Sequence, residues 1–144
     1  MNSIITTALS GLDAARQRLE VSAANVANVN SDGALPDPTA DPSKPQPYAP
    51  LRVSQQPLVS GGTFTTIRPV DPAVVQRYAP DASFANADGM VASPNVDLVG
   101  DGIDRMTAAR AYEANAQVMR VALDLQRETL DALASPKQRL DLNA

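Results

Sequence analysis

Residues 111–126 read AYEANAQVMRVALDLQ, a stretch that places apolar side chains on two opposite sides of one helix. One row, the first seam, consists of Ala109, Tyr112, Ala116, Met119, Leu123, Leu130 and Leu133. The other row, the second seam, consists of Ala111, Ala114, Val118, Val121, Leu125 and Ala132. Both keep helical spacing, and their offset of two residues is roughly 200° around the helix. A surface helix of a small domain needs only one apolar stripe, so the second seam requires an explanation.

Two explanations of the second seam are open. Its side chains are mostly Ala and Val, which tolerate exposure, or the helix is buried from two sides in an assembly. A polar stripe separates the seams on one side of the helix and consists of Arg110, Glu113, Gln117, Arg120, Asp124, Arg127 and Asp131. Because an uncovered apolar face marks a protein interface, we expect the first seam to pack within the chain and the second to meet a neighbour. The reverse assignment stays open.

Both ends of the chain carry helical patterns. Residues 3–29 follow a heptad-like row of Ile5, Leu9, Leu12, Leu19, Ala23 and Val26. The cluster of Asn, Ser, Asp and Gly at residues 28–33 predicts the end of this helix. The second helix is expected to begin between Asn95 and Asp101 and to end before Ser135–Pro136.

The middle of the chain has no helical pattern. Residues 34–50 hold six prolines and are expected to form a loop. Residues 51–70 are β-prone around Ser60–Gly61–Gly62, which predicts a hairpin. Residues 71–94 are expected to be irregular, with a turn at Asp88–Gly89, and residues 135–144 to be frayed.

These patterns predict a mostly α fold with a small β insert. Two long terminal helices would pair as an antiparallel coiled coil, with a Pro-rich loop and a β-hairpin between them. The expected segments are an N-terminal helix in 1–31, a Pro-rich and β region in 32–94, a C-terminal helix in 95–134 and a flexible tail in 135–144. With three Tyr, two Phe and no Trp, the core should be thin.

Composition also bounds the chemistry. The chain has no Cys and no His, which removes disulfides, thiol nucleophiles, the usual zinc ligands and the commonest general base. Asp97, Asp101 and Asp104 lack the spacing of an EF-hand loop and are expected only to favour a helix N-terminus. We therefore expect no enzyme, and neither catalytic, cofactor nor metal sites.

Net charge and hydropathy exclude several classes of binding partner. A net charge of −4 without a basic block argues against nucleic acid. No apolar run is long enough to span a bilayer. The first twenty residues lack the basic and apolar regions of a cleaved secretory signal. No small-molecule substrate is expected.

Two stretches resemble a known family. SGLDAARQRLEVSAANVANVNS (residues 10–31) is similar to the N-terminal signature of flagellar rod and hook proteins. DGMVASPNVDLVGDGIDRMTAARAYEANAQVMRVALDL (residues 88–125) resembles the C-terminal part of proximal-rod subunits of the FlgC type. The positions that carry the likeness are Ser10, Gly11, Leu12, Leu19, Ala23, Asn25, Val26, Ala27, Asn28, Gly89, Val91, Pro94, Asn95, Val96, Asp97, Met106, Arg110, Tyr112, Ala114, Asn115, Val118 and Met119.

The resemblance implies a structural subunit of the flagellar basal-body rod. Such a subunit is exported uncleaved through the flagellar type III export apparatus and polymerises, with copies of itself and other rod proteins, into the periplasmic drive shaft. Taken with the seams, the resemblance gives the expected assembly contacts: Leu9, Leu12, Leu19, Asn25, Val26 and Asn28 on the first helix, and Tyr112, Ala114, Asn115, Val118, Met119, Val121 and Leu125 on the second. The alternatives are another axial protein or divergent paralogue, a secreted helical interaction protein, or an export chaperone.

Overall fold

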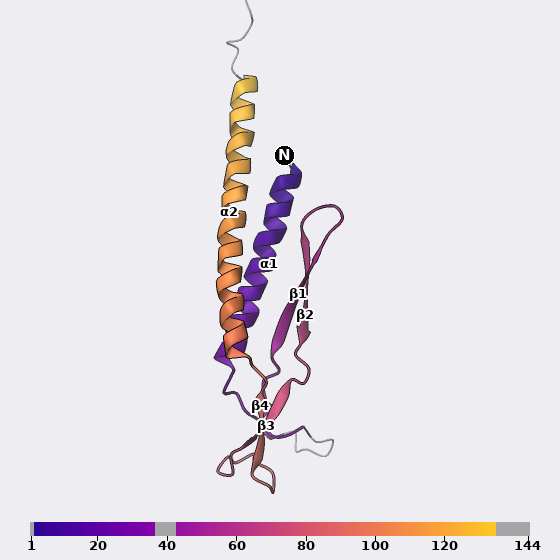
Figure 1. Cartoon of the computed structure of the whole chain (residues 1–144), viewed down its shortest axis with the longest axis vertical. Coiled ribbons are helices and arrows are strands. Elements are labelled where there is room, and N and C mark those ends of the chain that lie inside the picture. The colour runs from indigo at the N-terminus through magenta and orange to yellow at the C-terminus, as the bar shows by residue number, and fades with distance from the viewer. Residues whose placement is uncertain (1, 37–42, 135–144) are drawn as a thin grey trace, which may run out of the picture.

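Two long antiparallel helices form the frame of an elongated molecule (Figure 1). The computed structural model describes residues 2–36 and 43–134. Helix α1 spans Asn2–Ala27 and helix α2 spans Leu98–Ala134. They run side by side in opposite directions, and α2 continues past the N-terminal end of α1 (Figure 1). The predicted antiparallel pair of terminal helices is therefore confirmed.

Local hydrogen bonds define where each helix stops or starts. At the end of α1, the Asn28 side-chain amide donates to the Ala24 carbonyl at 2.9 Å, and the Ser31 N–H donates to the Asn28 carbonyl at 3.0 Å. At the start of α2, the Asp97 carboxylate accepts the Gly100 N–H at 3.0 Å. A side-chain oxygen that accepts an otherwise unpaired N–H is the usual way to cap a helix, and Asp97 lies within the predicted start region.

The predicted hairpin is present and lies along α1. Strands β1 (Leu51–Pro57) and β2 (Thr63–Pro69) pair antiparallel. Gly61 and Gly62 have φ of 90° and 91°, which glycine adopts without strain, so they form the turn. Helix α1 thus lies between α2 and this hairpin (Figure 1).

A second strand pair lies where the prediction was wrong. Residues 71–94 were expected to be irregular, but β3 (Val74–Tyr78) and β4 (Met90–Pro94) pair antiparallel. The residues of β4 from Val91 onward are all buried, so this strand lacks the apolar–polar alternation that marks a strand in sequence. The turn expected at Asp88–Gly89 is confirmed by the positive φ of Gly89.

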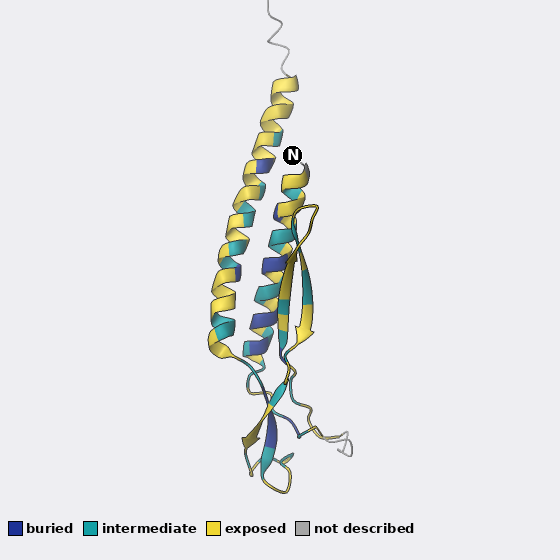
Figure 2. Ribbon diagram, turned by 45° about the vertical axis from the view of Figure 1, so that its right-hand side comes forward, coloured by how far each residue is buried: buried dark blue, intermediate teal, exposed yellow. Residues whose placement is uncertain are grey.

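The core between the two helices is built from small side chains. Ala8, Ala15 and Ser22 of α1 are buried, and so are Ala108 and Ala122 of α2. The dark band in Figure 2 shows how burial concentrates on α1 rather than on α2. Small residues let two helices approach closely, so this contact is narrow and leaves most of the circumference of α2 uncovered.

This packing corrects the expected orientation of the helices. The buried line of α2 passes between the two seams, so that neither seam as a whole packs against α1. On α1, the expected row from Ile5 to Val26 lies beside the buried line of Ala8, Ala15 and Ser22. The predicted contact faces were wrong because large apolar residues dominate a hydropathy pattern, whereas small residues form the contact between the helices.

Replacing Ala108 by Leu should destabilise the fold. Ala108 has no exposed surface, and added methyl groups in a tight core usually cost about 1–3 kcal/mol. Urea unfolding of Ala108→Leu should show this loss. Ala114→Leu, the same change at an exposed position of the same helix, should alter the unfolding free energy by less than about 0.5 kcal/mol. Equal effects of the two substitutions would contradict the close-packed contact.

Candidate assembly interface

The register of the two helices is set by three contacts between them. Arg18 and Asp104 form an ion pair at 2.6 Å, and the Ser22 hydroxyl donates to the Asp101 carbonyl at 2.8 Å. Farther along, a Cβ on Gly11 would lie 2.6 Å from Asn115 Oδ1, so the absence of a side chain there makes room for the Asn115 amide. These contacts orient α2 and determine which of its faces remain uncovered.

Asn25 joins three parts of the molecule. Its side-chain amide donates to the Leu51 carbonyl at 2.9 Å, and its side-chain oxygen accepts the Leu51 N–H at 3.0 Å and the Tyr48 hydroxyl at 3.1 Å. The amide also reaches both carboxylate oxygens of Asp101 at 3.4 Å. Asn25 therefore connects α1 to the first residue of β1 and to the first turn of α2.

Asp101 occupies a partly buried position at this junction, on the wall of an open cavity of about 300 Å³. Burial raises the pKa of its carboxyl above the usual 3.8, and the charges of Asp104 and Asp97 raise the pKa further, while the hydrogen bond from Asn25 lowers it. The three acids expected to favour the helix N-terminus thus differ in role, since Asp97 caps α2 and Asp104 pairs with Arg18. Among the described residues, no three acidic side chains gather closely enough to hold a metal ion.

The expected contacts on α1 fall into two groups. Leu9 is 56% exposed, and Leu12, Leu19 and Val26 are half-buried. Asn25 itself is only 3% exposed, so the structure places it inside the molecule. Asn28 is half-buried and bonds to the end of its own helix.

The expected contacts on α2 also divide. Tyr112, Ala114, Val118, Val121 and Leu125 are exposed. Met119 and Asn115 are half-buried, and the Asn115 amide donates to the Ala111 carbonyl at 2.8 Å within α2. Tyr112 belongs to the first seam and Val118 to the second, so exposed apolar side chains flank the buried line on both sides.

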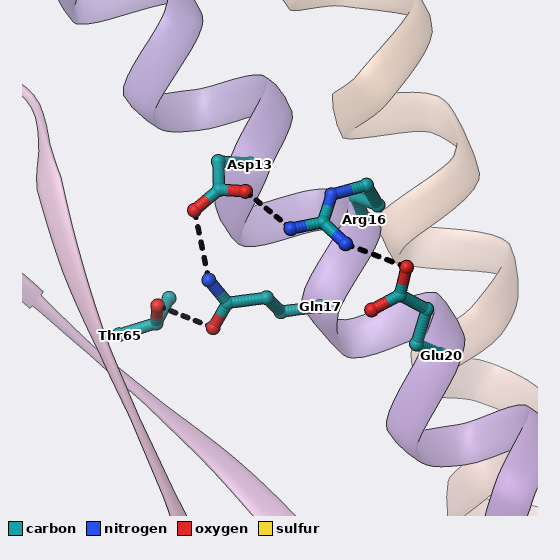
Figure 3. A network of polar contacts seen from close by, with 5 residues as sticks. All are labelled: Asp13, Arg16, Gln17, Glu20 and Thr65. Atoms are coloured by element: carbon teal, nitrogen blue, oxygen red, sulfur yellow. Dashed lines mark hydrogen bonds and ion pairs between the residues drawn. The ribbon is translucent and has the colours of Figure 1, made fainter.

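A network of charged and polar side chains covers the outer surface of α1 (Figure 3). Arg16 pairs with Asp13 and with Glu20, each at 2.6 Å, and Gln17 links Asp13 to Thr65 of β2. The hydrogen bond from Arg16 holds the pKa of Asp13 below its usual 3.8. The hairpin is attached at a second point, where the Thr63 N–H donates to the Ser10 hydroxyl at 3.1 Å.

The residues that hold the helices together were missed in the sequence, although a signal exists. Ala8, Ala15 and Ser22 recur every seven residues, as do Ala108, Asn115 and Ala122. A seven-residue repeat of small residues, like a seven-residue repeat of leucines, is a signal of packing between two helices. Asn25 was singled out for the family signature and not for its hydrogen bonds to the hairpin.

The fold and its surface define a structural protein. Two close-packed terminal helices present apolar residues outward, and no described helix is both long and apolar enough to cross a membrane. Residues 5–34 match the family model described as flagella basal body rod protein, and residues 87–132 match that of the flagellar basal body rod FlgEFG protein C-terminal region.

Curated relatives agree with the family models. The chain is 32% identical over 130 residues to the flagellar basal-body rod protein FlgC of Yersinia enterocolitica, covering 89% of this chain and 94% of the relative. Identity is 34% over 136 residues with FlgC of Escherichia coli O6:H1, with the same coverage, and 35% over 127 residues with FlgC of Agrobacterium fabrum, covering 86% and 88%. The chain belongs to the FlgC family of flagellar basal-body rod proteins, a structural and non-enzymatic family.

Asn25→Ala should loosen the hairpin from the helices. The substitution leaves both backbone groups of Leu51 without their side-chain partners, and an unsatisfied part-buried polar group costs about 1–3 kcal/mol. Urea unfolding should report that loss, and hydrogen exchange of the Leu51 amide should become faster. Asn30→Ala, at an exposed position just beyond α1, serves as the control and should change neither measurement. Unchanged exchange at Leu51 in Asn25→Ala would contradict the junction.

Asp101→Asn should stabilise the protein at neutral pH. A carboxyl whose pKa is raised by folding contributes stability that is full below pH 3.8 and is lost as the pH rises through the folded-state pKa. The side-chain amide in Asp101→Asn cannot ionise, so the stability of the variant should not fall with rising pH for this reason. Urea titrations from pH 3.5 to pH 7 should show the difference between variant and wild type growing with pH. A less stable variant at pH 7 would mean that the bond from Asn25 outweighs the burial of the charge.

Proposed function

We propose that this chain polymerises, as a rod subunit, through the outward faces of its two terminal helices. The observation that carries the proposal is the set of exposed apolar side chains along both helices, which includes Leu9 on α1 and Val118, Val121 and Leu125 on α2. A row of this kind on a small protein marks a surface that another protein covers. The proposed partners are copies of the chain and other rod proteins.

The proposed contacts are the expected residues that the molecule leaves accessible. On α1 these are Leu9, Leu12, Leu19 and Val26, and on α2 they are Tyr112, Ala114, Val118, Val121 and Leu125. Asn25, Asn28 and Asn115 take internal roles instead, because their hydrogen bonds hold the helix pair and its ends. Met119 is half-buried beside the buried line of α2 and is left out of the proposed contacts. The helices then serve as the axial core, with the hairpin of β1 and β2 lying along α1 and the β3–β4 pair lying beyond one end of the helix pair (Figure 1).

The proposed location is the periplasmic rod between the membrane-embedded base and the hook, where the assembled shaft transmits torque. The names of the relatives support this location. We further propose that the flagellar type III apparatus exports the chain with its N-terminus intact. The tail at residues 135–144 lies outside the described residues and has no assigned role.

Val118→Asp should block rod assembly while leaving the monomer folded. Val118 is 48% exposed, so a carboxylate there stays solvated in the free chain but would be buried against an apolar neighbour in the rod. In a strain that lacks its own copy, the variant should be exported yet give few or no motile cells. The control is Val75→Asp on β3, a position that is 45% exposed and remote from both helices.

Two measurements complete this test. Purified basal bodies should contain the wild-type chain and the Val75→Asp variant but not Val118→Asp, and circular dichroism should be alike for all three. Full motility of Val118→Asp would exclude this face of α2 from assembly. Absence of the wild-type chain from basal bodies would overturn the proposed function.

A further inference from the structure

The outward face of α1 carries a short row of alternating charge. Asp13, Arg16 and Glu20 read minus, plus, minus at a spacing of three and then four residues. All three are exposed, and their side chains lie on the outer side of α1, away from the ribbon of α2 (Figure 3). The row has a net charge of −1 and a fixed geometry, because Arg16 bonds to both acids.

The outward face of α2 carries the opposite row. Arg120, Asp124 and Arg127 read plus, minus, plus at a spacing of four and then three residues, with a net charge of +1. They are exposed on the polar stripe, which lies opposite the buried line of Ala108 and Ala122. Arg127 and Asp124 approach to 3.8 Å.

The two rows match in only one orientation. If α1 of one molecule runs antiparallel to α2 of another, Asp13 faces Arg127, Arg16 faces Asp124 and Glu20 faces Arg120. The spacing of three and four residues is then equal on both helices, so all three pairs are opposite in sign. In a parallel arrangement the spacing of three and four residues on α1 meets the spacing of four and three residues on α2. The two central charges, Arg16 and Asp124, are then out of line by one residue.

Two pairs of leucines fit nearly the same register, with an offset of two residues. Leu12 and Leu19 are seven residues apart on α1, and Leu123 and Leu130 are seven apart on α2. With Arg16 opposite Asp124, Leu12 lies two residues from the position that faces Leu130, and Leu19 lies two residues from the position that faces Leu123. This offset is about 3 Å along the helix axis. Viewed along each helix from its N-terminus, the two leucines lie about 80° to the same side of the charged row. When the two helices pack antiparallel with the charged rows facing each other, the leucines of both helices therefore lie on the same side of the contact.

We propose that a second copy of this chain docks its α1 onto the outer face of α2 in this register. The inference rests on the proposed function and specifies one contact within the polymer. The leucine pairs supply buried apolar area, and the charge rows set register and direction, since exposed ion pairs add little affinity by themselves. Asp131, the next acid on the stripe, falls opposite Leu9 and is left outside the pairing.

This contact produces an assembly that does not close on itself. The two docking surfaces are different faces of the molecule, so the contact is heterologous and continues from copy to copy. Within one chain Gly11 lies level with Asn115, whereas the proposed register brings Arg16 level with Asp124. The neighbour is therefore displaced by about 20–25 Å toward the C-terminal end of α2. Its α1 covers the part of α2 that projects beyond the chain's own α1 (Figure 1).

Charge reversal tests the pairing. One variant carries Asp13→Lys and Glu20→Lys, which makes the α1 row all positive, and another carries Arg120→Glu and Arg127→Glu, which makes the α2 row all negative. In a strain that lacks its own copy, each variant alone should lower the motile fraction by at least about tenfold, because like charges then meet at the contact. A chain with all four substitutions should recover motility, because its two rows are again complementary.

Cysteine cross-linking tests the register. The chain has no native Cys, so Leu19→Cys with Leu123→Cys adds the only two thiols. Within one molecule these positions are about 25 Å apart along the helices, too far for a disulfide. Oxidation of isolated basal bodies should therefore give a ladder of linked copies. Leu19→Cys with Ala116→Cys, on the same side of α2 but one heptad out of register, should give none.

The outcomes separate this inference from the function on which it rests. Recovery by the four-substitution chain together with the Leu19–Leu123 ladder supports the docking. If each reversal impairs motility but the combination does not restore it, or if the Ala116 pair cross-links as well, the proposed register is overturned. If the wild-type chain enters basal bodies and neither reversal impairs motility, the docking is overturned and the rod function stands. If the wild-type chain does not enter basal bodies, both are overturned.

Discussion

The close approach of α1 and α2 is the constraint on which the rest of the molecule depends. Ala8, Ala15 and Ser22 of α1 are buried, as are Ala108 and Ala122 of α2, so small side chains make up much of the contact. A leucine in place of one of these buried alanines would overpack the contact. The larger apolar side chains of both helices are therefore left on the outside, where only another molecule can cover them. The narrow internal contact and the wide external apolar surface are two results of the same choice of residues.

The junction around Asn25 transmits that constraint to the β segment. One buried amide satisfies both backbone groups of Leu51 and touches Asp101, so the hairpin starts from a point fixed relative to both helices. A second attachment, between Thr63 and Ser10, holds the far end of the hairpin. A two-stranded hairpin is marginal by itself in water. Its order here follows from hydrogen bonds to α1 at both ends, and the hairpin in turn covers the side of α1 opposite the uncovered leucines.

The elements were largely predictable from sequence, and their orientation was not. Helix length, the turn at Gly61–Gly62 and the region in which α2 begins follow from local signals that act within a few residues. The faces of the helices were misjudged, because hydropathy favours leucine over alanine while close packing selects alanine. Strands β3 and β4 were missed for a related reason. The burial of β4 comes from distant partners, among them Gly33, which exchanges backbone hydrogen bonds with Ala92 at 2.9 Å, and Asp32, which bonds to Ser93 and Arg77.

The same packing couples stability to assembly. An alanine buries far less apolar area than a leucine, so a helix pair joined by alanines gains little free energy from its internal contact. The part of α2 beyond α1 gains none from it, because no described element lies beside it (Figure 1). A partner that binds only the ordered helices shifts the equilibrium toward the folded state by mass action. In a polymer every copy both receives and provides this stabilisation. Under the proposed function, a weak internal contact would ease unfolding of the free chain for export, and the same helices would become rigid once neighbours cover their leucines.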